Sequence, residues 1–250
     1  MFYSYNEFKA IENQQSPYAK EVFAELIQNI TNPEFPCYYA KRVIPKNSLY
    51  VSFIENFENR QAMFKQAMKA FMQYAEIERE CDPYRVFVLS FKVETTSWEE
   101  DNALMYDFMH YLNQHDPEPW FEEMPTDTND PLWSLSFMGM PWFFNLNSPN
   151  NTHRKSRNVT NTFSLVLQRT DSFEQLLRKE LADEVREKQR IIIRKEIRKR
   201  IGIYDGQSVS PSLAGEADNY NNLEWIQFHL PDLNSQKPQA TCPFKHFAQP

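Results

Sequence analysis

The sequence predicts an α+β protein: a single domain with a mainly antiparallel five-stranded sheet packed against several helices. Strand-like segments follow one another between residues 133 and 169 with no room for crossover helices, so these strands are expected to pair antiparallel. Segments with a helical spacing of apolar residues lie mostly before and after that stretch. No internal repeat or Gly/Ser linker divides the chain, so residues 1–250 are expected to form one domain.

Helices are predicted where apolar side chains recur every three or four residues, which is typical of a helix with one buried face. Ser16 and Pro17 suit the start of the first helix, and Ser97 with Glu100 forms a capping box before the third. Gly202 suits the end of the fourth. The predicted helices cover residues 17–29, 60–80, about 98–112 and 173–201, with a further short helix within 220–228.

Strands are predicted where apolar residues alternate with polar ones or where β-branched and aromatic residues cluster. Residues 85–93 are dense in such residues and are expected to form a central strand. Two strands are expected to meet around Gly139–Pro141. The predicted strands cover residues 49–57, 85–93, 133–139, 141–147 and 162–169, and the tail from 229 to 250 is expected to be irregular.

The charge and glycine content exclude several classes of protein. The chain carries 27 Lys and Arg against 34 Asp and Glu, a net charge of −7, whereas nucleic-acid binders usually carry a basic excess. The basic run from Arg186 to Arg200 is interpreted as the charged surface of a helix, so no nucleic-acid partner is expected. Only four glycines are present, which excludes the glycine-rich phosphate loops of P-loop and Rossmann enzymes.

Signals for secretion or membrane insertion are missing from the sequence. The N-terminal residues include early acidic side chains and no apolar h-region, and no run of 18 apolar residues occurs. The three cysteines, Cys37, Cys81 and Cys242, have no C-x-x-C spacing, which argues against a disulfide framework or a zinc ribbon. We expect a reduced cytoplasmic protein with no membrane partner.

A basic cluster directly follows a predicted strand and is the main candidate site. His153, Arg154 and Arg157, with Lys155 between them, can hold carboxylate or phosphate groups, the arginines by a bidentate fork. Neighbouring cations disfavour a proton on His153 and so favour a neutral imidazole that can bind a metal. The alternative is that this cluster is a solvated loop.

The cysteines and the late histidines are weaker candidates for a site. Cys37 lies among aromatic residues, where a cysteine is usually buried and inert; as a thiolate it could instead bind a metal or act as a nucleophile. Cys242 has the same ambiguity. His229 and His246 fall in the irregular tail and are expected at the surface.

Several stretches of the chain occur together in a recognisable order. They are FPCYYAK, HDPEPWFEEMPTDTNDPLW, SFMGMPWFFNLNSP, HRKSRN, NNLEWIQFHLPD and TCPF. Their order and spacing, from about Phe35 to Phe244, resemble those of the YqcI/YcgG family of bacterial proteins. The resemblance implies a haem-dependent monooxygenase that N-hydroxylates a guanidino compound such as arginine.

That resemblance also implies a set of site residues and partners. The cofactor would be haem b, with His153 as the axial iron ligand and Cys37 as the alternative; Arg154 and Arg157 would bind a carboxylate of the haem or of the substrate. A carboxylate is expected to hold the guanidinium group bidentately. Candidates for that carboxylate are Asp127, Asp130 and Glu224. An external electron donor is expected, because the sequence has no flavin or nicotinamide fingerprint.

Two alternative functions remain open from the sequence. The chain could bind or sense through haem without oxygenase activity. It could also be a non-enzymatic protein whose motifs serve structure, through tight turns and buried aromatic residues.

Overall fold

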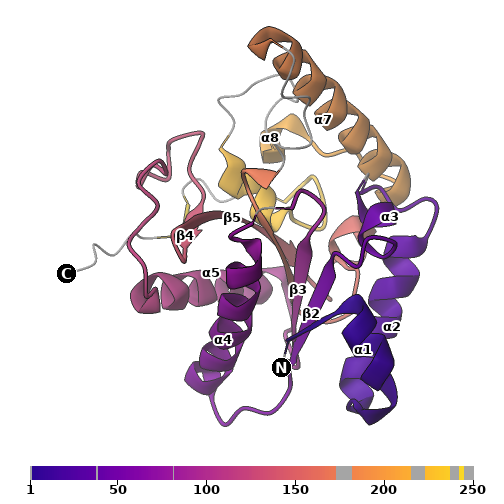
Figure 1. The fold of residues 1–250 in the computed structure, drawn as a ribbon. Coiled ribbons are helices and arrows are strands. Elements are labelled where there is room, and N and C mark those ends of the chain that lie inside the picture. Colours follow the sequence, from indigo (N-terminus) through magenta and orange to yellow (C-terminus); the bar gives the residue numbers. More distant parts are fainter. Residues whose placement is uncertain are drawn as a thin grey trace.

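A six-stranded mixed sheet forms the centre of the computed structural model, with helices on both faces (Figure 1). The structure describes residues 2–37, 39–80, 82–172, 182–214, 223–236 and 242–244, with the backbone alone for residues 183, 212, 214 and 224. The strand order in the sheet is β1-β2-β3-β6-β5-β4. The α+β class and the mainly antiparallel sheet predicted from the sequence are therefore confirmed.

The sheet has one strand more than the sequence predicted. β1 pairs antiparallel with β2 at the sheet edge, and its three residues are too few to give an alternating pattern of their own. β2 and β3 are the parallel pair, and β3–β6, β6–β5 and β5–β4 are antiparallel. The strands are β1 Phe2–Ser4, β2 Leu49–Ile54, β3 Val86–Phe91, β4 Leu135–Phe137, β5 Met140–Asn147 and β6 Ser164–Arg169.

Helices cover the two faces of the sheet because successive strand residues point to opposite sides. On β3, Phe87 and Leu89 pack with α4 and α5, whereas Val88 packs with α1 and α2 on the other face. α4 is the crossover that the parallel pair β2–β3 requires. The helices are α1 Tyr5–Ile11, α2 Pro17–Thr31, α3 Ala40–Val43, α4 Arg60–Glu78, α5 Trp98–His115, α7 Asp183–Asp205 and α8 Pro211–Ala214, with single 3₁₀ turns η1 Glu12–Gln14, η2 Lys155–Arg157 and η3 Glu224–His229.

The predicted helix starts at Ser16 and Ser97 are confirmed, but one predicted end is wrong. Ser16 Oγ accepts the backbone N–H of Ala19 at 3.0 Å, and Ser97 Oγ accepts that of Glu100 at 3.2 Å. Gly202 does not end α7; the helix continues to Asp205, and Gly206 takes the left-handed conformation at φ +70° that ends it. The predicted start of that helix, at residues 173–181, lies outside the described residues. The short helix expected within 220–228 is the 3₁₀ turn η3, where the structure describes it.

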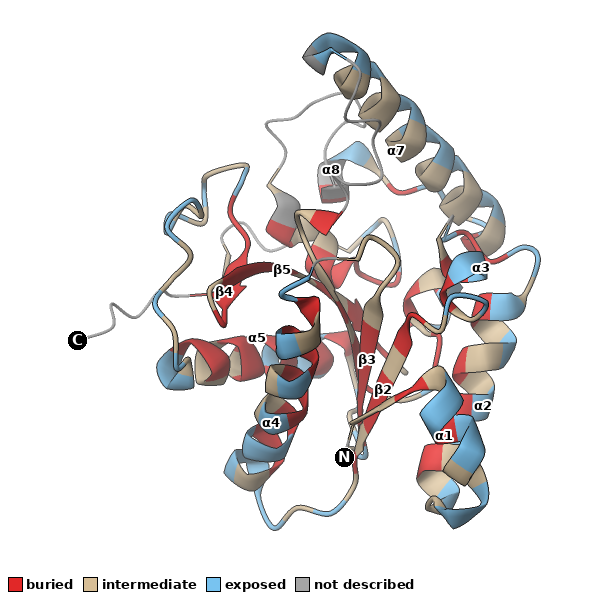
Figure 2. Cartoon of the chain, in the orientation of Figure 1, coloured by how far each residue is buried: buried red, intermediate tan, exposed pale blue. Residues whose placement is uncertain are grey.

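α7 presents a charged surface, as the sequence predicted. Residues 184–204 are all exposed or half-buried, and its C-terminal residue, Asp205, is buried against η2. Figure 2 shows the contrast between this helix and the buried inner faces of α4 and α5. Ile192 and Ile203 are exposed apolar side chains on it.

Aromatic side chains fill the larger core, between the sheet and α4 and α5. Phe71 on α4 is fully buried, and its ring lies 4.9 Å from that of Phe137 and 4.7 Å from that of Trp142. It also contacts the rings of Phe87 and Phe144, so it touches β3, β4 and β5 at once. Phe71 is therefore the side chain that joins α4 to the middle of the sheet.

Replacing Phe71 by Ala is expected to lower the free energy of unfolding by about 3–5 kcal/mol, because a cavity forms where neighbouring rings cannot collapse fully. Urea denaturation measures the loss. Leu132→Ala is the control, since Leu132 is 73% exposed and the change should cost less than about 0.5 kcal/mol. Equal losses in the two variants would contradict the assignment of Phe71 to the core.

Glu78, in the last turn of α4, is a buried carboxylate without a close cation. Its side chain is 1% exposed, and its nearest ion-pair partner, Arg85, lies 3.9 Å away. Burial raises the pKa of Glu78 to about 7, although the positive charge of Arg85 acts in the opposite direction. The folded protein therefore holds a proton on Glu78 that the unfolded chain releases above its ordinary pKa of 4.5.

This raised pKa gives a pH dependence with a definite sign. The contribution of Glu78 to the free energy of unfolding is most favourable below pH 4.5, where the group is protonated in both states. It is lost as pH rises from 4.5 to about 7, and the total loss is roughly 3 kcal/mol. Glu78→Gln removes the titration, so the unfolding free energy of wild type should fall relative to that of the variant across this range. Urea denaturation at a series of pH values measures both. If the free energies of unfolding of wild type and Glu78→Gln differ by the same amount at every pH, Glu78 is not a buried ionisable group.

Candidate functional site

Two segments far apart in sequence meet beside the end of β5, and we call them the basic loop (residues 148–158) and the C-terminal segment (residues 223–236). Asp232 joins them. Its carboxylate accepts the backbone N–H groups of His153 at 2.7 Å and Arg154 at 2.8 Å. It also accepts the hydroxyl of Thr152 at 3.1 Å. Burial alone would raise the pKa of Asp232, but these hydrogen bonds and that of the His153 ring hold it below its ordinary value.

His153 has its ring oriented by this carboxylate. Nδ1 lies 2.9 Å from Asp232 Oδ2 and 3.0 Å from the hydroxyl of Thr152, so Nε2 is the nitrogen left for another ligand. A carboxylate at one ring nitrogen is the arrangement usual for metal-binding histidines. The side chain is, however, 60% exposed to solvent.

Arg154 is fully buried and ties three segments together. Its Nε donates to the carbonyl of Pro231 at 2.6 Å, and Nη2 donates to Asn234 Oδ1 at 3.0 Å. Nη1 lies 3.8 Å from the carboxylate of Asp205 at the end of α7. Asp205 in turn accepts the backbone N–H and the hydroxyl of Ser156 at 2.8 and 2.7 Å. Two of the three guanidinium nitrogens thus donate hydrogen bonds within the described chain, whereas Nη1 has only the more distant carboxylate of Asp205.

Arg157 is also buried, and its side chain makes fewer hydrogen bonds than that of Arg154 among the described residues. Its Nη1 donates to Asn145 Oδ1 on β5, and its backbone carbonyl accepts the N–H of Ser148 at 2.8 Å. Burial lowers the pKa of Arg157 to about 10, and the nearby charge of Arg154 lowers it further, while Asp205 acts in the opposite direction. A guanidinium in this position is suited to meet an additional anionic group.

His229 is buried beside Arg157, although the sequence placed it at the surface. It ends η3, and its neighbours Phe228 and Leu230 are buried too, so the whole turn packs inward. Tyr106 on α5 forms a hydrogen bond with His229 Nδ1 at 3.2 Å. Burial lowers the pKa of His229 to about 3, with the charge of Arg157 adding to the effect, so the ring is neutral at neutral pH. The sequence contains one indication that His229 is buried, because an apolar residue stands on each side of it.

The other predicted residues lie apart from this centre or outside the described side chains. Cys37 is exposed, which corrects the expectation of burial; Phe35 and Pro36 take the interior positions instead. Asp127 and Asp130 lie in successive turns, where they accept the backbone N–H groups of Asn129 and Leu132. The Glu224 side chain and His246 lie outside what the structure describes.

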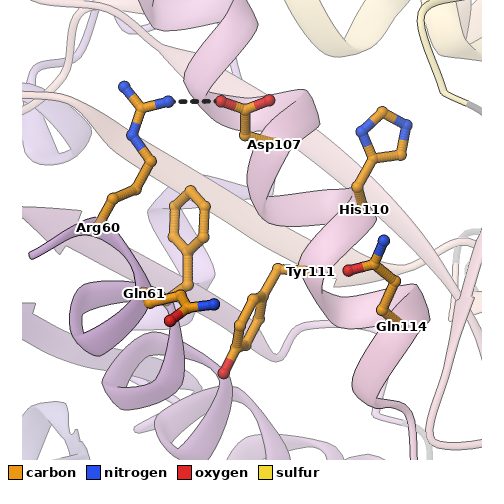
Figure 3. Close-up of a pocket in the computed structure, with 7 residues that line it drawn as sticks. Arg60, Gln61, Asp107, His110, Tyr111 and Gln114 are labelled. Carbon is orange, nitrogen blue, oxygen red and sulfur yellow. Dashed lines mark hydrogen bonds and ion pairs between the residues drawn. The ribbon is translucent and has the colours of Figure 1, made fainter.

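Two surface hollows border α4 and α5 rather than the basic loop. Figure 3 shows the first, of about 260 Å³, where Arg60 pairs with Asp107 at 2.6 Å across its rim. The second, of about 480 Å³, carries Glu58, Glu94 and Glu100 and reaches Thr95, which accepts a hydrogen bond from Asn150 of the basic loop. None of the residues predicted from the sequence to bind cofactor or substrate lines either hollow.

The described part of the chain contains neither a metal-binding cluster nor a membrane-spanning helix. No group of three or more His, Cys, Asp or Glu side chains there could hold a metal ion. None of the described helices is both long and apolar enough to cross a membrane. A metal held by protein ligands alone therefore has no candidate among these residues.

Comparison with known proteins identifies the family. The sequence pattern of the YqcI/YcgG family matches residues 23–245, so the chain belongs to this family, as its motifs predicted. It is 27% identical to DcsA of Streptomyces lavendulae, provisionally named an N(omega)-hydroxy-L-arginine synthase, over 90% of this chain and 83% of DcsA. It is also 26% identical to YqcI of Bacillus subtilis, over 97% of this chain and 93% of YqcI. The Bacillus subtilis protein YcgG is 27% identical over 91% of this chain and 87% of YcgG. No solved structure is significantly similar.

Asp232→Ala is expected to lower the free energy of unfolding by about 2–4 kcal/mol, because the backbone N–H groups of His153 and Arg154 lose their acceptor in a partly buried place. Asp127→Ala is the matched control: it also removes a carboxylate that accepts a backbone N–H, but in an exposed turn, and should cost less than about 1 kcal/mol. Guanidinium denaturation compares them. If Asp232→Ala lowers the free energy of unfolding no more than Asp127→Ala does, the Asp232 carboxylate does not hold the two segments together.

Proposed function

We propose that this chain is a haem-dependent monooxygenase that N-hydroxylates a guanidino compound such as arginine. The observation that carries the proposal is the similarity to DcsA, which extends over 90% of the chain. The compound in that relative's name is arginine with an oxygen atom on a guanidino nitrogen. The proposal transfers this reaction class to the present chain.

The buried centre supports the proposal through the chemistry of its side chains. Haem needs an axial donor for its iron and favours cations near its propionates. Imidazole groups are present at His153 and His229, and guanidinium groups at Arg154 and Arg157. Among the described residues, the Arg157 side chain donates one hydrogen bond, to Asn145, which leaves donors for a propionate or a substrate carboxylate. Cys37 stays the alternative axial ligand from the sequence, at an exposed position.

Bound haem would supply the activation of dioxygen. With two electrons from an external donor and two protons, one oxygen atom of O₂ enters the N–H bond as N–OH and the other leaves as water. The protein would hold the planar guanidinium group, for which a bidentate carboxylate is suited. Asp127, Asp130 and Glu224 are the carboxylates proposed for this task. Fixing the orientation of the substrate is what makes one nitrogen react.

The proposal is tested by loading the full-length chain with haem and adding L-arginine. Protein expressed with a haem precursor should show a Soret band, arginine should shift it, and a reductant with O₂ should yield N-hydroxyarginine detectable by mass spectrometry. L-citrulline, which lacks the cationic guanidinium, is the control and should shift the band much less.

The outcomes separate the three functions considered from the sequence. A Soret band with no response to arginine, agmatine or other guanidino compounds would favour haem binding or sensing without oxygenase activity. A colourless protein that also fails to bind added haemin would contradict the proposal and favour a non-enzymatic role.

A further inference from the structure

α7 gathers positive charge on a chain that is acidic as a whole. From Lys188 to Arg200 the helix carries seven Lys and Arg and a single acidic residue, Glu196. The whole chain carries 27 Lys and Arg against 34 Asp and Glu. Glu196 is itself paired with Arg200, one helical turn away, at 2.9 Å. This part of α7 is therefore a basic patch on an acidic protein.

The exposed side chains of α7 include a stripe along one side of the helix. Its members recur at intervals of three or four residues, which places them on one face. Figure 2 shows exposed residues recurring along the helix. We call outward stripe the lysines and large aliphatic residues that alternate there: Val185, Lys188, Ile192, Lys195, Lys199 and Ile203.

The outward stripe carries an unusual share of exposed apolar surface. Ile192 is 66% exposed and Ile203 is 74% exposed. Of the five large apolar side chains that the described part of the chain exposes, three lie on this stripe. At a rise of 1.5 Å per residue, the distance from Val185 to Ile203 is about 27 Å. That length suits the small interfaces of transient electron-transfer complexes.

The C-terminal end of α7 is fixed against the rest of the protein beside the basic loop. The ring of Tyr204 meets that of Phe35 edge-on, with centroids 5.7 Å apart. Asp205 accepts the backbone N–H and the hydroxyl of Ser156 in the basic loop. A partner that contacts Ile203, two residues before Asp205, therefore lies close to the basic loop.

We propose that the outward stripe is the docking surface for a small acidic electron-transfer protein, such as an acidic [2Fe–2S] ferredoxin or a flavodoxin. The inference rests on the proposed function, which needs electrons from outside because the chain has no flavin or nicotinamide fingerprint. Each encounter oxidises one donor by one electron. Two encounters with two protons reduce one oxygen atom of O₂ to water, while the other enters the N–H bond.

The two kinds of residue on the outward stripe have separate tasks in this docking. The lysines attract the acidic partner and raise its rate of association, because opposite charges steer a diffusional encounter. The aliphatic side chains supply the apolar contact at which water is excluded. Ile203, beside the basic loop, brings the partner to the side of α7 where the proposed chemistry lies.

Other anionic partners match the outward stripe less well. A helix that binds a membrane surface presents a large apolar face on one side. Here lysines separate the aliphatic side chains, which stand about two helical turns or more apart. Single-stranded nucleic acids are held by cations together with aromatic rings on which the bases stack, and the stripe has no aromatic residue.

Matched charge reversals on two helices test the docking surface. Lys195→Glu/Lys199→Glu changes two exposed lysines of α7 that are four residues apart. Lys65→Glu/Lys69→Glu changes an exposed pair with the same spacing on α4. Both variants alter the net charge equally and keep residues that favour a helix.

Isothermal titration calorimetry measures the binding of an oxidised acidic [2Fe–2S] ferredoxin to the full-length chain, and this measurement needs no haem. At low ionic strength the α7 variant should bind at least about tenfold more weakly than wild type, and the α4 variant within about twofold of it. Added salt should weaken the binding of wild type and remove the difference between the variants.

Ile192→Ala/Ile203→Ala tests the apolar part of the stripe without a change of charge. This variant should bind the ferredoxin about fivefold more weakly and keep the salt dependence of wild type, because it removes buried apolar contact only. Leu132→Ala is the matched control, since Leu132 is 73% exposed elsewhere on the protein, and it should bind as wild type does.

Anaerobic stopped-flow absorbance then follows the reduction of the haemin-loaded chain. Reduced ferredoxin should reduce the α7 variant at least about tenfold more slowly than the α4 variant at low ionic strength. Dithionite needs no docking surface and should reduce the two variants at rates within about twofold of each other.

The outcomes separate this inference from the proposed function. Equal binding and equal reduction in the α7 and α4 variants overturn the inference alone, as does a wild-type chain that binds neither the ferredoxin nor a flavodoxin. Binding through the stripe to phosphatidylserine vesicles or duplex DNA, with none to the acidic proteins, also overturns it. A wild-type chain that takes up no haemin overturns the proposed function, and the electron-donor role of the partner with it.

Discussion

Two arginine side chains in the interior are the constraint on which the region around the basic loop depends. A buried cation costs several kcal/mol unless its surroundings supply hydrogen bonds and counter-charge. The partners of Arg154 come from the C-terminal segment and from the end of α7, and that of Arg157 comes from β5. Because these partners belong to separate elements, satisfying the two guanidinium groups closes those elements around one centre.

Asp232 supplies a second set of hydrogen bonds between the basic loop and the C-terminal segment. By accepting the two successive backbone N–H groups of the basic loop, it holds the loop against the C-terminal segment. η3 belongs to that segment, and its last residue, His229, stands three positions before Asp232 in the sequence. The conformation of the loop and the position of the segment that carries His229 therefore depend on one set of hydrogen bonds.

The hydrophobic pattern was sufficient to predict most of the regular structure. Strands and helices with a repeated period were found within a few residues of their observed bounds, because periodicity reports which side chains face the core. The sequence does not predict β1, because three residues are too few to show an alternating pattern. This strand pairs with the edge of β2. The end of α7 was placed at Gly202, whereas the left-handed turn falls on the next glycine, Gly206.

The site was harder to predict than the fold because burial of polar residues depends on partners distant in sequence. The basic cluster stands out in the sequence by its density of charge, but that density gives no sign that Arg154 is fully buried. His229 was assigned to the surface because the tail has no period, and only the contact with Tyr106 and two tryptophans explains its burial. Cys37 shows the reverse case: Phe35 and Pro36, just before it in the sequence, take the interior, and Cys37 is an exposed residue.

We propose that the N-hydroxylation chemistry takes place at the polar centre between the basic loop, α5 and the C-terminal segment. A crystal structure of the haem-loaded chain with L-arginine tests this claim most directly. The account predicts a haem whose iron binds a histidine nitrogen of this centre, with the guanidinium group of arginine beside the iron. A haem bound elsewhere on the protein, such as in the hollow between α4 and α5, would contradict it.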